Sequence, residues 1–314
     1  MIPTGTHVRV RVPATSANLG PGFDTLGLAL AYYDELEVEV RHEPGATVHI
    51  TGYGSADSGN PVPTNEKNLV VQAVAHAFAW AKQPLPGLTL RARNNIPHSR
   101  GMGSSSAAIV SGLLAAKGLL DGVVEFSEQT LLSLATEMEG HPDNVAPALF
   151  GGLTIAWTDE NGAHQKKLLV HRGVSPLVLV PSFTMSTKLA RSLQPDQVPH
   201  EDAIFNVSRS SLLVAALTQS PELLFVATED KLHQNYRAAA MPETNTLIAQ
   251  LRAAGFAAVV SGAGPSILVL CDDPSARQSA IDLVRTHQET TWEPHMLAVD
   301  FMGATVEVLP VVVA

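Results

Sequence analysis

The sequence is short of cysteine and of aromatic residues, and each shortage excludes a kind of protein. Cys271 is the single cysteine among 314 residues, so no intramolecular disulfide can form and a cysteine-based metal site is disfavoured. Aromatic residues make up only 5% of the chain, whereas glycine (23) and proline (21) are plentiful. This balance favours many turns and loops built from backbone over a protein built on stacked rings.

Positive charge and long apolar runs are also scarce. The formal net charge is −10, which argues against nucleic acid as a partner because phosphate backbones need clustered lysine and arginine. The uncharged stretch 255–271 is interrupted by Gly262, Gly264 and Pro265, so it predicts two strands and a turn rather than a membrane span. No basic and apolar segment opens the chain. We therefore expect a soluble, cytoplasmic protein with no membrane and no nucleic acid among its partners.

Strand and helix patterns are mixed in both halves of the chain. The alternation of Val8, Val10 and Val12 with polar residues predicts a half-buried strand. Further strands are expected at residues 35–40, 88–93, 176–182, 256–261, 267–271, 295–301 and 304–309. Helices are expected at residues 68–81, 105–120, 127–139, 200–217, 221–235, 243–254 and 275–287. Loops are expected at residues 14–27 and 94–104 and at the start of the segment 145–157.

Length and element order together predict two domains. A chain of 314 residues exceeds one average domain, and it turns polar between residues 157 and 172. We therefore expect domains at residues 1–160 and 161–314. Strands and helices without regular βαβ alternation indicate the α+β class. Whether a C-terminal strand returns to the first domain is left open by the sequence.

The strongest local signal is a run of glycine and serine, residues 97–108, at the entrance to an apolar helix. Gly101 and Gly103 let the backbone approach an anion, and the free amides of a helix N-terminus point at it. A dinucleotide-binding turn fits poorly, because Ser106 takes the place of its third glycine, and a P-loop lacks its lysine here. The run therefore predicts a phosphate-binding site, with a plain glycine-rich helix cap as the alternative.

Three segments in order carry a resemblance to a known family. Residues 97–108 resemble the central phosphate-binding motif of the GHMP kinases, which include galactokinases, homoserine kinases and mevalonate kinases. Residues 12–27 and 261–266 are similar to the family's first and third motifs, and residues 12–27 and 139–152 are most similar to the homoserine kinase branch. The resemblance implies an N-terminal domain like ribosomal protein S5 domain 2 and a ferredoxin-like C-terminal domain. It also implies a step of threonine biosynthesis.

The resemblance implies ATP and Mg²⁺ as cofactors. The residues that it places on the phosphates are Pro97, Arg100, Gly101, Met102, Gly103, Ser104, Ser105, Ser106 and Ala107. Mg²⁺ falls on Glu139 and Ser105, with Glu137 as a competitor for the carboxylate. Asn65 is a candidate contact for adenine or ribose, and a helix N-cap is its alternative.

The substrate that the resemblance implies is L-homoserine, a zwitterion. Its site needs an anion for the ammonium group, which Asp24 can supply, and cations for the carboxylate, which Arg191 and Arg237 can supply. The other substrate residues that the resemblance implies are Asn18, His141, Asp143, Asn144 and Thr187. Turn capping is the alternative for Asn18 and Asp24, and a solvated surface position is the alternative for each arginine.

For catalysis we expect Asn144 to orient the substrate hydroxyl and Asp143 to hold the ammonium group, with Ser105 at the metal and no obligatory general base. The alternatives are another GHMP kinase, such as one acting on mevalonate, and a nucleotide-binding relative without catalysis. A homodimer is left open.

Overall fold

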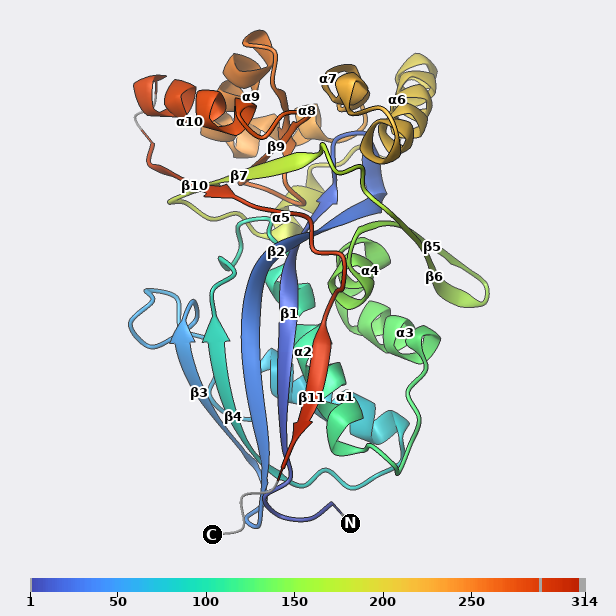
Figure 1. Ribbon diagram of the computed structural model, residues 1–314, viewed down its shortest axis with the longest axis vertical. Coiled ribbons are helices and arrows are strands. Elements are labelled where there is room, and N and C mark those ends of the chain that lie inside the picture. Colours follow the sequence, from blue (N-terminus) through green and yellow to red (C-terminus); the bar gives the residue numbers. More distant parts are fainter. Residues whose placement is uncertain (1, 288–289, 311–314) are drawn as a thin grey trace.

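The computed structural model describes residues 2–287 and 290–310. It contains two β-sheets with helices packed on them, joined end to end along the long axis of the molecule (Figure 1). Strands and helices are mixed in both parts, which confirms the α+β class and the two-domain organisation that the resemblance implies.

The larger sheet has seven strands in the described residues, and its central strand is unusually long. The 20-residue strand β2 pairs with β1 along most of its length, with β5 through residues 26–28 and with β4 through residues 35–41. The path through the sheet is β11-β1-β2-β4-β3, and β5 and β6 branch from β2. Its strands are β1 (His7–Asn18), β2 (Gly22–Arg41), β3 (Ala46–Gly52), β4 (Gly87–Asn94), β5 (Leu153–Asp159), β6 (Gly162–Leu168) and β11 (Thr305–Leu309).

The expected loop at residues 14–27 is wrong. Most of this segment belongs to the paired strands β1 and β2, and the turn between them is only residues 19–21. Every residue from Val12 to Leu19 is buried, so the segment has no alternation of polar and apolar positions to announce a strand.

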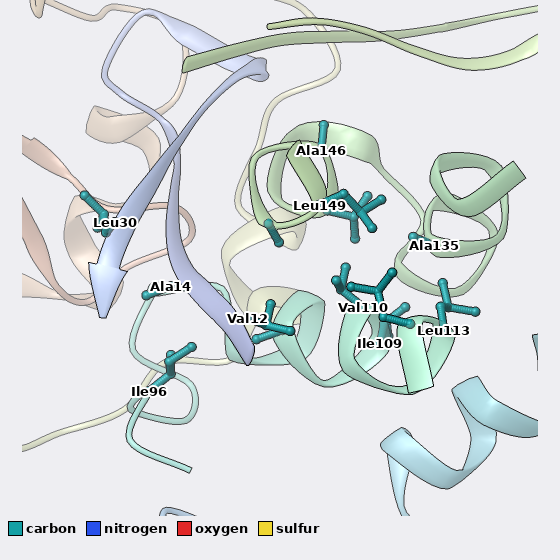
Figure 2. Close-up of a cluster of buried hydrophobic side chains, with 14 of the residues drawn as sticks. Val12, Ala14, Leu30, Ile96, Ile109, Val110, Leu113, Ala135, Ala146 and Leu149 are labelled. Atoms are coloured by element: carbon teal, nitrogen blue, oxygen red, sulfur yellow. The ribbon is translucent and has the colours of Figure 1, made fainter. Parts of the chain in front are cut away.

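Four helices cover one face of the larger sheet. They are α1 (Leu69–Trp80), α2 (Ser104–Leu119), α3 (Glu128–Glu139) and α4 (Pro142–Phe150). Figure 2 shows part of their packing: Val110 of α2 faces Leu149 of α4, and Leu113 of α2 lies beside Ala135 of α3. The start of α3 is confirmed, because the Ser127 hydroxyl accepts a hydrogen bond from the Thr130 amide.

The loop expected at the start of the segment 145–157 is also wrong, because α4 runs through it to Phe150. Pro142 lies in the first turn, where no intrahelical amide bond is needed, and Pro147 lies inside the helix.

The smaller sheet has the topology of a ferredoxin-like domain. Its four strands run in the order β10-β7-β9-β8, and every neighbouring pair is antiparallel. They are β7 (Ser175–Pro181), β8 (Ala257–Val260), β9 (Ile267–Cys271) and β10 (Trp292–Met296). Two helices, α9 (Pro242–Ala253) and α10 (Ala276–His287), pack on one face. Cys271 is buried in that layer, where burial raises the pKa of its thiol to about 11.

The segment between β7 and α9 supplies short helices instead of the long one expected at residues 221–235. After α5 (Thr187–Ser192) and α6 (His200–Thr218), only α7 (Leu224–Ala227) and α8 (Gln234–Arg237) are α-helical before α9. Strand β10 begins earlier than expected and ends at Met296, because the chain then crosses back to the first sheet.

The chain passes between the two sheets twice. It leaves the larger sheet after β6 and returns in β11, which pairs with β1 from Arg11 to His7. The expected division between residues 160 and 161 falls in the turn between β5 and β6, and both of these strands belong to the larger sheet. Among the described helices, none has the length and apolarity of a membrane span.

Candidate active site

The three motif segments meet at the junction of the two sheets. They are the motif hairpin (residues 12–27), the phosphate loop (residues 97–103) and the C-terminal turn (residues 261–264). The Ser261 hydroxyl donates to the carbonyl of Gly101 at 2.6 Å, which ties the turn to the loop. Segments that are up to 250 residues apart in sequence therefore form one polar surface.

Two glycines of the phosphate loop are required by the geometry. Gly101 and Gly103 both have φ of +71°. A Cβ on Gly101 would overlap the carbonyl oxygen of Ser261, and a Cβ on Gly103 would overlap Oγ1 of Thr15. Positive φ and close packing together exclude other side chains at these positions.

The phosphate loop ends in the free amides of helix α2. Gly103 is the N-cap of the helix and provides no side-chain cap, so the first-turn amides of residues 104–106 have no intrahelical acceptor. Ser104 and Ser105 line the cleft, whereas Pro97, Met102 and Ala107 are buried and line neither this cleft nor the pocket beside it. This end of α2 is suited to bind phosphate.

Glu139 is the carboxylate that faces this helix terminus. Its two carboxylate oxygens accept hydrogen bonds from the hydroxyls of Ser105 at 2.8 Å and Ser106 at 3.0 Å. Glu137 instead contacts His76 on α1 at 3.1 Å. One carboxylate beside hydroxyl oxygens is a donor set that fits Mg²⁺, which fills its remaining positions with phosphate and water. Within residues 2–287 and 290–310, no group of three or more His, Cys, Asp and Glu suggests a different metal centre.

Most of the predicted site residues line one polar cleft beside this helix terminus. They are Asn18, Asp24, Gly101, Gly103, Ser104, Ser105, Glu139, His141, Asp143, Asn144, Thr187, Arg191 and Arg237. The cleft also includes residues that the sequence reasoning did not single out, among them Ser99, Met185 and Ala263. Nothing in the sequence distinguishes Ser99. In the structure it stands out by its positive φ of +55°, which is uncommon for a residue other than glycine.

Opposite charges pair across the cleft. Two guanidinium nitrogens of Arg191 lie 3.0 and 3.3 Å from the carboxylate oxygens of Asp24. The Asp24 turn is held by Asn18, whose Oδ1 accepts from the Asp24 amide while its Nδ2 donates to Gly262 O at 2.8 Å. Asn18 therefore positions the carboxylate of Asp24.

Arg237 is the buried cation of the cleft, with an exposed fraction of 2%. Its guanidinium lies 5.1 Å from the ring centre of Phe23, which stacks in turn on His233. Burial lowers the pKa of Arg237, and its Nε has no hydrogen-bond partner among the described residues. A buried guanidinium with an unused donor is suited to bind an anionic group.

His141, Asp143 and Asn144 begin helix α4. Nδ1 of His141 is hydrogen-bonded to the buried Asp143 carboxylate. Burial alone would lower the pKa of His141, but the hydrogen bond and the charge of Asp143 outweigh it and raise that pKa. Oδ1 of Asn144 accepts from the Thr15 hydroxyl at 2.8 Å, which fixes its amide group with Nδ2 as the remaining donor.

A second, larger pocket adjoins the polar cleft, and the two share Ser99, Ser104 and Ser105. Its walls are mainly apolar and come from Leu36, Val48, Ile50, Val62, Pro63, Leu69, Val70, Ala92 and Ala108. Asn65 is exposed and is not among the residues that line either pocket. Asn68 is the N-cap of α1. The larger pocket has the dimensions and the lining of a site for a flat organic group.

Asp34 is a pocket residue that the sequence reasoning missed. It is 8% exposed, and one of its oxygens accepts from the amides of Asn95 and Ile96. Burial raises the pKa of Asp34 to about 6, although these amide bonds act in the opposite direction. The sequence could have indicated its burial. Side chains two residues apart on a strand point to the same face, and Asp34 is spaced in this way from the inward-facing Leu36 and Val38.

Arg100, a predicted phosphate contact, directs its charged side chain away from the site. Its guanidinium donates to the carbonyls of His98, Pro181 and Ser182. It does not line either pocket.

Comparisons with known proteins agree with this geometry. The sequence profiles of the GHMP kinases N terminal domain and of the GHMP kinases C terminal region match residues 68–152 and 212–289. A homoserine kinase of Leifsonia xyli subsp. xyli is 70% identical over 96% of this chain and 93% of its own length. One of Streptomyces coelicolor is 47% identical over 95% and 94%.

Solved structures extend the likeness to the fold. The crystal structure of a homoserine kinase from Cytophaga hutchinsonii has a TM-score of 0.84 at 26% identity, over 96% of this chain and 98% of that one. The L. major mevalonate kinase in complex with R-mevalonate has a TM-score of 0.67 at 16% identity over 93% and 95%, a likeness of fold alone. The chain belongs to the GHMP kinase family.

Proposed function

We propose that this enzyme transfers the γ-phosphoryl group of ATP to the side-chain hydroxyl of L-homoserine, a step of threonine biosynthesis in the cytoplasm. The names of its relatives, at up to 70% identity, support this reading. The observation that carries it is the set of charges in the cleft: Asp24 and Arg191 face each other, with the buried Arg237 beside them. An amino acid offers the complementary ammonium and carboxylate.

A zwitterion can replace the ion pair between Asp24 and Arg191, because its two charges can bind the two side chains separately. The side chains of Asp24 and Arg191 are 40% and 41% exposed, and a pair this exposed contributes at most about 1 kcal/mol. The homoserine ammonium would take the place of the guanidinium at Asp24. Its carboxylate would bind Arg191 and Arg237. Mevalonate has a carboxylate but no ammonium group, so it would leave Asp24 without a partner.

The nucleotide is assigned to the other pocket. Its base would lie between the apolar walls, and its phosphates would reach the free amides of α2 through the shared serines. Mg²⁺ would be held by Glu139 and Ser105, and when bound it neutralises charge on the phosphates. Ser106 is buried and donates to Glu139, so it holds the carboxylate in place.

For the transfer itself, we assign orientation rather than proton abstraction to the side chains. The Nδ2 group of Asn144, fixed by Thr15, would direct the substrate hydroxyl. Asp143 already accepts from His141 and would add negative charge for the ammonium group. A loose phosphoryl transition state does not require full removal of the hydroxyl proton before transfer.

A substrate panel tests the proposal. The purified enzyme is incubated with ATP, Mg²⁺ and either homoserine, serine, threonine or mevalonate, and the phosphorylated product is followed by ³¹P NMR. Homoserine should give the highest kcat/KM, and chelation of Mg²⁺ should stop turnover. Glu139→Gln serves as a control for contaminating kinases and should lose activity. Preference for mevalonate would overturn the substrate assignment, and ATP binding without any turnover would favour the non-catalytic alternative.

A further inference from the structure

Arg100 lies in the phosphate loop, but its side chain points toward the other domain. Nε donates to the carbonyl of Pro181 at 2.9 Å, and Nη2 donates to that of Ser182 at 2.8 Å. Nη1 donates to the carbonyl of His98 in the loop itself at 3.2 Å. The planar guanidinium group of Arg100 thus joins the phosphate loop to the end of β7 through the adjacent carbonyls of Pro181 and Ser182.

A backbone bond reinforces the same connection. The amide of Met185 donates to the carbonyl of Ser99 at 3.0 Å. Met185 is 5% exposed and packs against Ala190 of α5. Residues 181–185 are therefore attached to the phosphate loop at three points, by two bonds from Arg100 and one to Ser99.

The attached segment leads directly into the substrate side of the cleft. Helix α5 starts at Thr187, and its N-cap Ser186 accepts from the amide of Leu189. Thr187 and Arg191 of this helix line the cleft, and Arg191 pairs with Asp24. The helix has only six residues, so its position depends on what holds the segment before it.

We propose that Arg100 is a positioning residue that sets the substrate segment, residues 182–191, relative to the phosphate loop. It binds neither nucleotide nor amino acid. It places α5 so that Arg191, which would hold the carboxylate, lies at a set distance from the free amides of α2. The expected effect on KM rests on the proposed function, whereas the hydrogen bonds that join the phosphate loop to residues 181–185 do not depend on it.

The first test compares Arg100→Ala with Arg277→Ala. Arg277 also donates to two backbone carbonyls, those of Pro274 and Leu297, but it lies outside both pockets. Arg100→Ala should raise the KM for homoserine about ten- to hundredfold, because a displaced Arg191 would lose its charge-assisted contact with the carboxylate, with a much smaller change in kcat. The dissociation constant of ATP measured without homoserine should change less than about twofold. Arg277→Ala should change neither.

Two results would overturn the proposal. One is a homoserine KM in Arg100→Ala equal to that of Arg277→Ala. The other is weaker ATP binding with an unchanged homoserine KM, which would mean that Arg100 acts on the nucleotide. Arg100→Lys covers the case in which the alanine variant does not fold. Lysine keeps the charge but lacks the rigid planar group that reaches the carbonyls of His98, Pro181 and Ser182 together, so its homoserine KM should also rise, and a wild-type value would contradict the proposal.

A second measurement separates this inference from the proposed function. Hydrogen–deuterium exchange of the free protein should show faster exchange in the substrate segment, residues 182–191, in Arg100→Ala and an unchanged rate there in Arg277→Ala. If the wild-type enzyme does not phosphorylate homoserine but this segment loosens, the function is wrong and the positioning role stands. If the segment exchanges at the wild-type rate, the positioning role is wrong.

Discussion

The two adjoining pockets are built in different ways. The apolar pocket takes all of its lining from residues 34–111, within the larger domain. The polar cleft takes its lining from residues 18–264 and combines side chains of both domains. Nucleotide affinity should therefore be a local property of the first domain, whereas affinity for the amino acid should depend on how the second domain is placed. The variants below test this contrast.

The largest effect is expected where the two pockets meet. In Gly103→Ala the new Cβ overlaps Oγ1 of Thr15, so the end of the phosphate loop must shift away from Thr15 of β1. Gly122→Ala is a matched control, because Gly122 has φ of +72° and no neighbour within 4 Å of an added Cβ. The control should suffer only the backbone strain, on the order of 1–3 kcal/mol of stability. The Gly103 variant should in addition bind ATP on the order of a hundredfold more weakly by calorimetry. Equal ATP affinity in the two variants would contradict the role of this loop.

The next effect concerns the apolar pocket alone. Asp34→Asn keeps an acceptor for the amides of Asn95 and Ile96 but cannot ionise. The folded pKa of Asp34, about 6, is above its ordinary value of 3.8, so the folded state holds the proton more tightly than the unfolded state does. The wild type should therefore lose stability as pH rises from 4 to 7, by about 3 kcal/mol relative to Asp34→Asn.

Denaturant unfolding of both proteins at pH 4, 5, 6 and 7 measures this difference. At pH 4 the two free energies of unfolding should nearly agree. A gap that stays constant over the range would mean that the carboxyl group has its ordinary pKa and is solvated by the pocket.

The sequence predicted the local geometry of the candidate site best where one segment carries the residues. The phosphate-binding prediction depended on Gly101, Gly103 and the three serines that open a helix, and local backbone geometry follows directly from such residues. The motif hairpin was harder, because both of its faces are buried and no period of two remains in residues 12–19. The strand could be recognised only from its partners.

Helix α4 shows a second limit. Pro147 removes the amide that would bond to the carbonyl of Asp143, and for that reason the segment reads as a loop. In the structure that carbonyl is packed against Gly27, where a Cβ would overlap it. Gly27, which leaves room for this helix, is 116 residues before Asp143 in the sequence, so no local pattern reveals the helix. Arg100 is similar, because nothing in its neighbourhood tells whether a guanidinium faces a phosphate or backbone carbonyls.

A smaller effect separates the polar cleft from its neighbour. Arg191→Ala and Arg237→Ala should each weaken homoserine binding about ten- to hundredfold, with ATP affinity unchanged. Arg237→Ala should have the larger effect, because its guanidinium is buried whereas Arg191 is 41% exposed. Arg209→Ala, which breaks a pair with Glu229 outside both pockets, is the control. If both cleft variants behave like the control toward homoserine, the carboxylate binds elsewhere.

The smallest expected effect is the most informative about mechanism, and it concerns Asp143. Asp143→Asn keeps the shape of the side chain and an acceptor for His141, but it removes the negative charge. If Asp143 only attracts the ammonium group, KM for homoserine should rise about tenfold with kcat nearly unchanged. Loss of a general base would instead lower kcat by about a hundred- to ten-thousandfold at saturating substrate.

The neighbouring histidine provides a readout of the same charge that is independent of turnover. The pKa of His141 is raised because the hydrogen bond and charge of Asp143 outweigh burial. In Asp143→Asn the charge is lost and His141 can donate only to a neutral oxygen, so the pKa of His141 should fall, as an NMR titration of the ring would detect. His141 should then lose its proton at lower pH than in the wild type. A lowered His141 pKa together with a raised KM would show that Asp143 acts through charge on the ligand side of the cleft. A large fall in kcat at unchanged KM would make Asp143 the base and contradict the orientation mechanism.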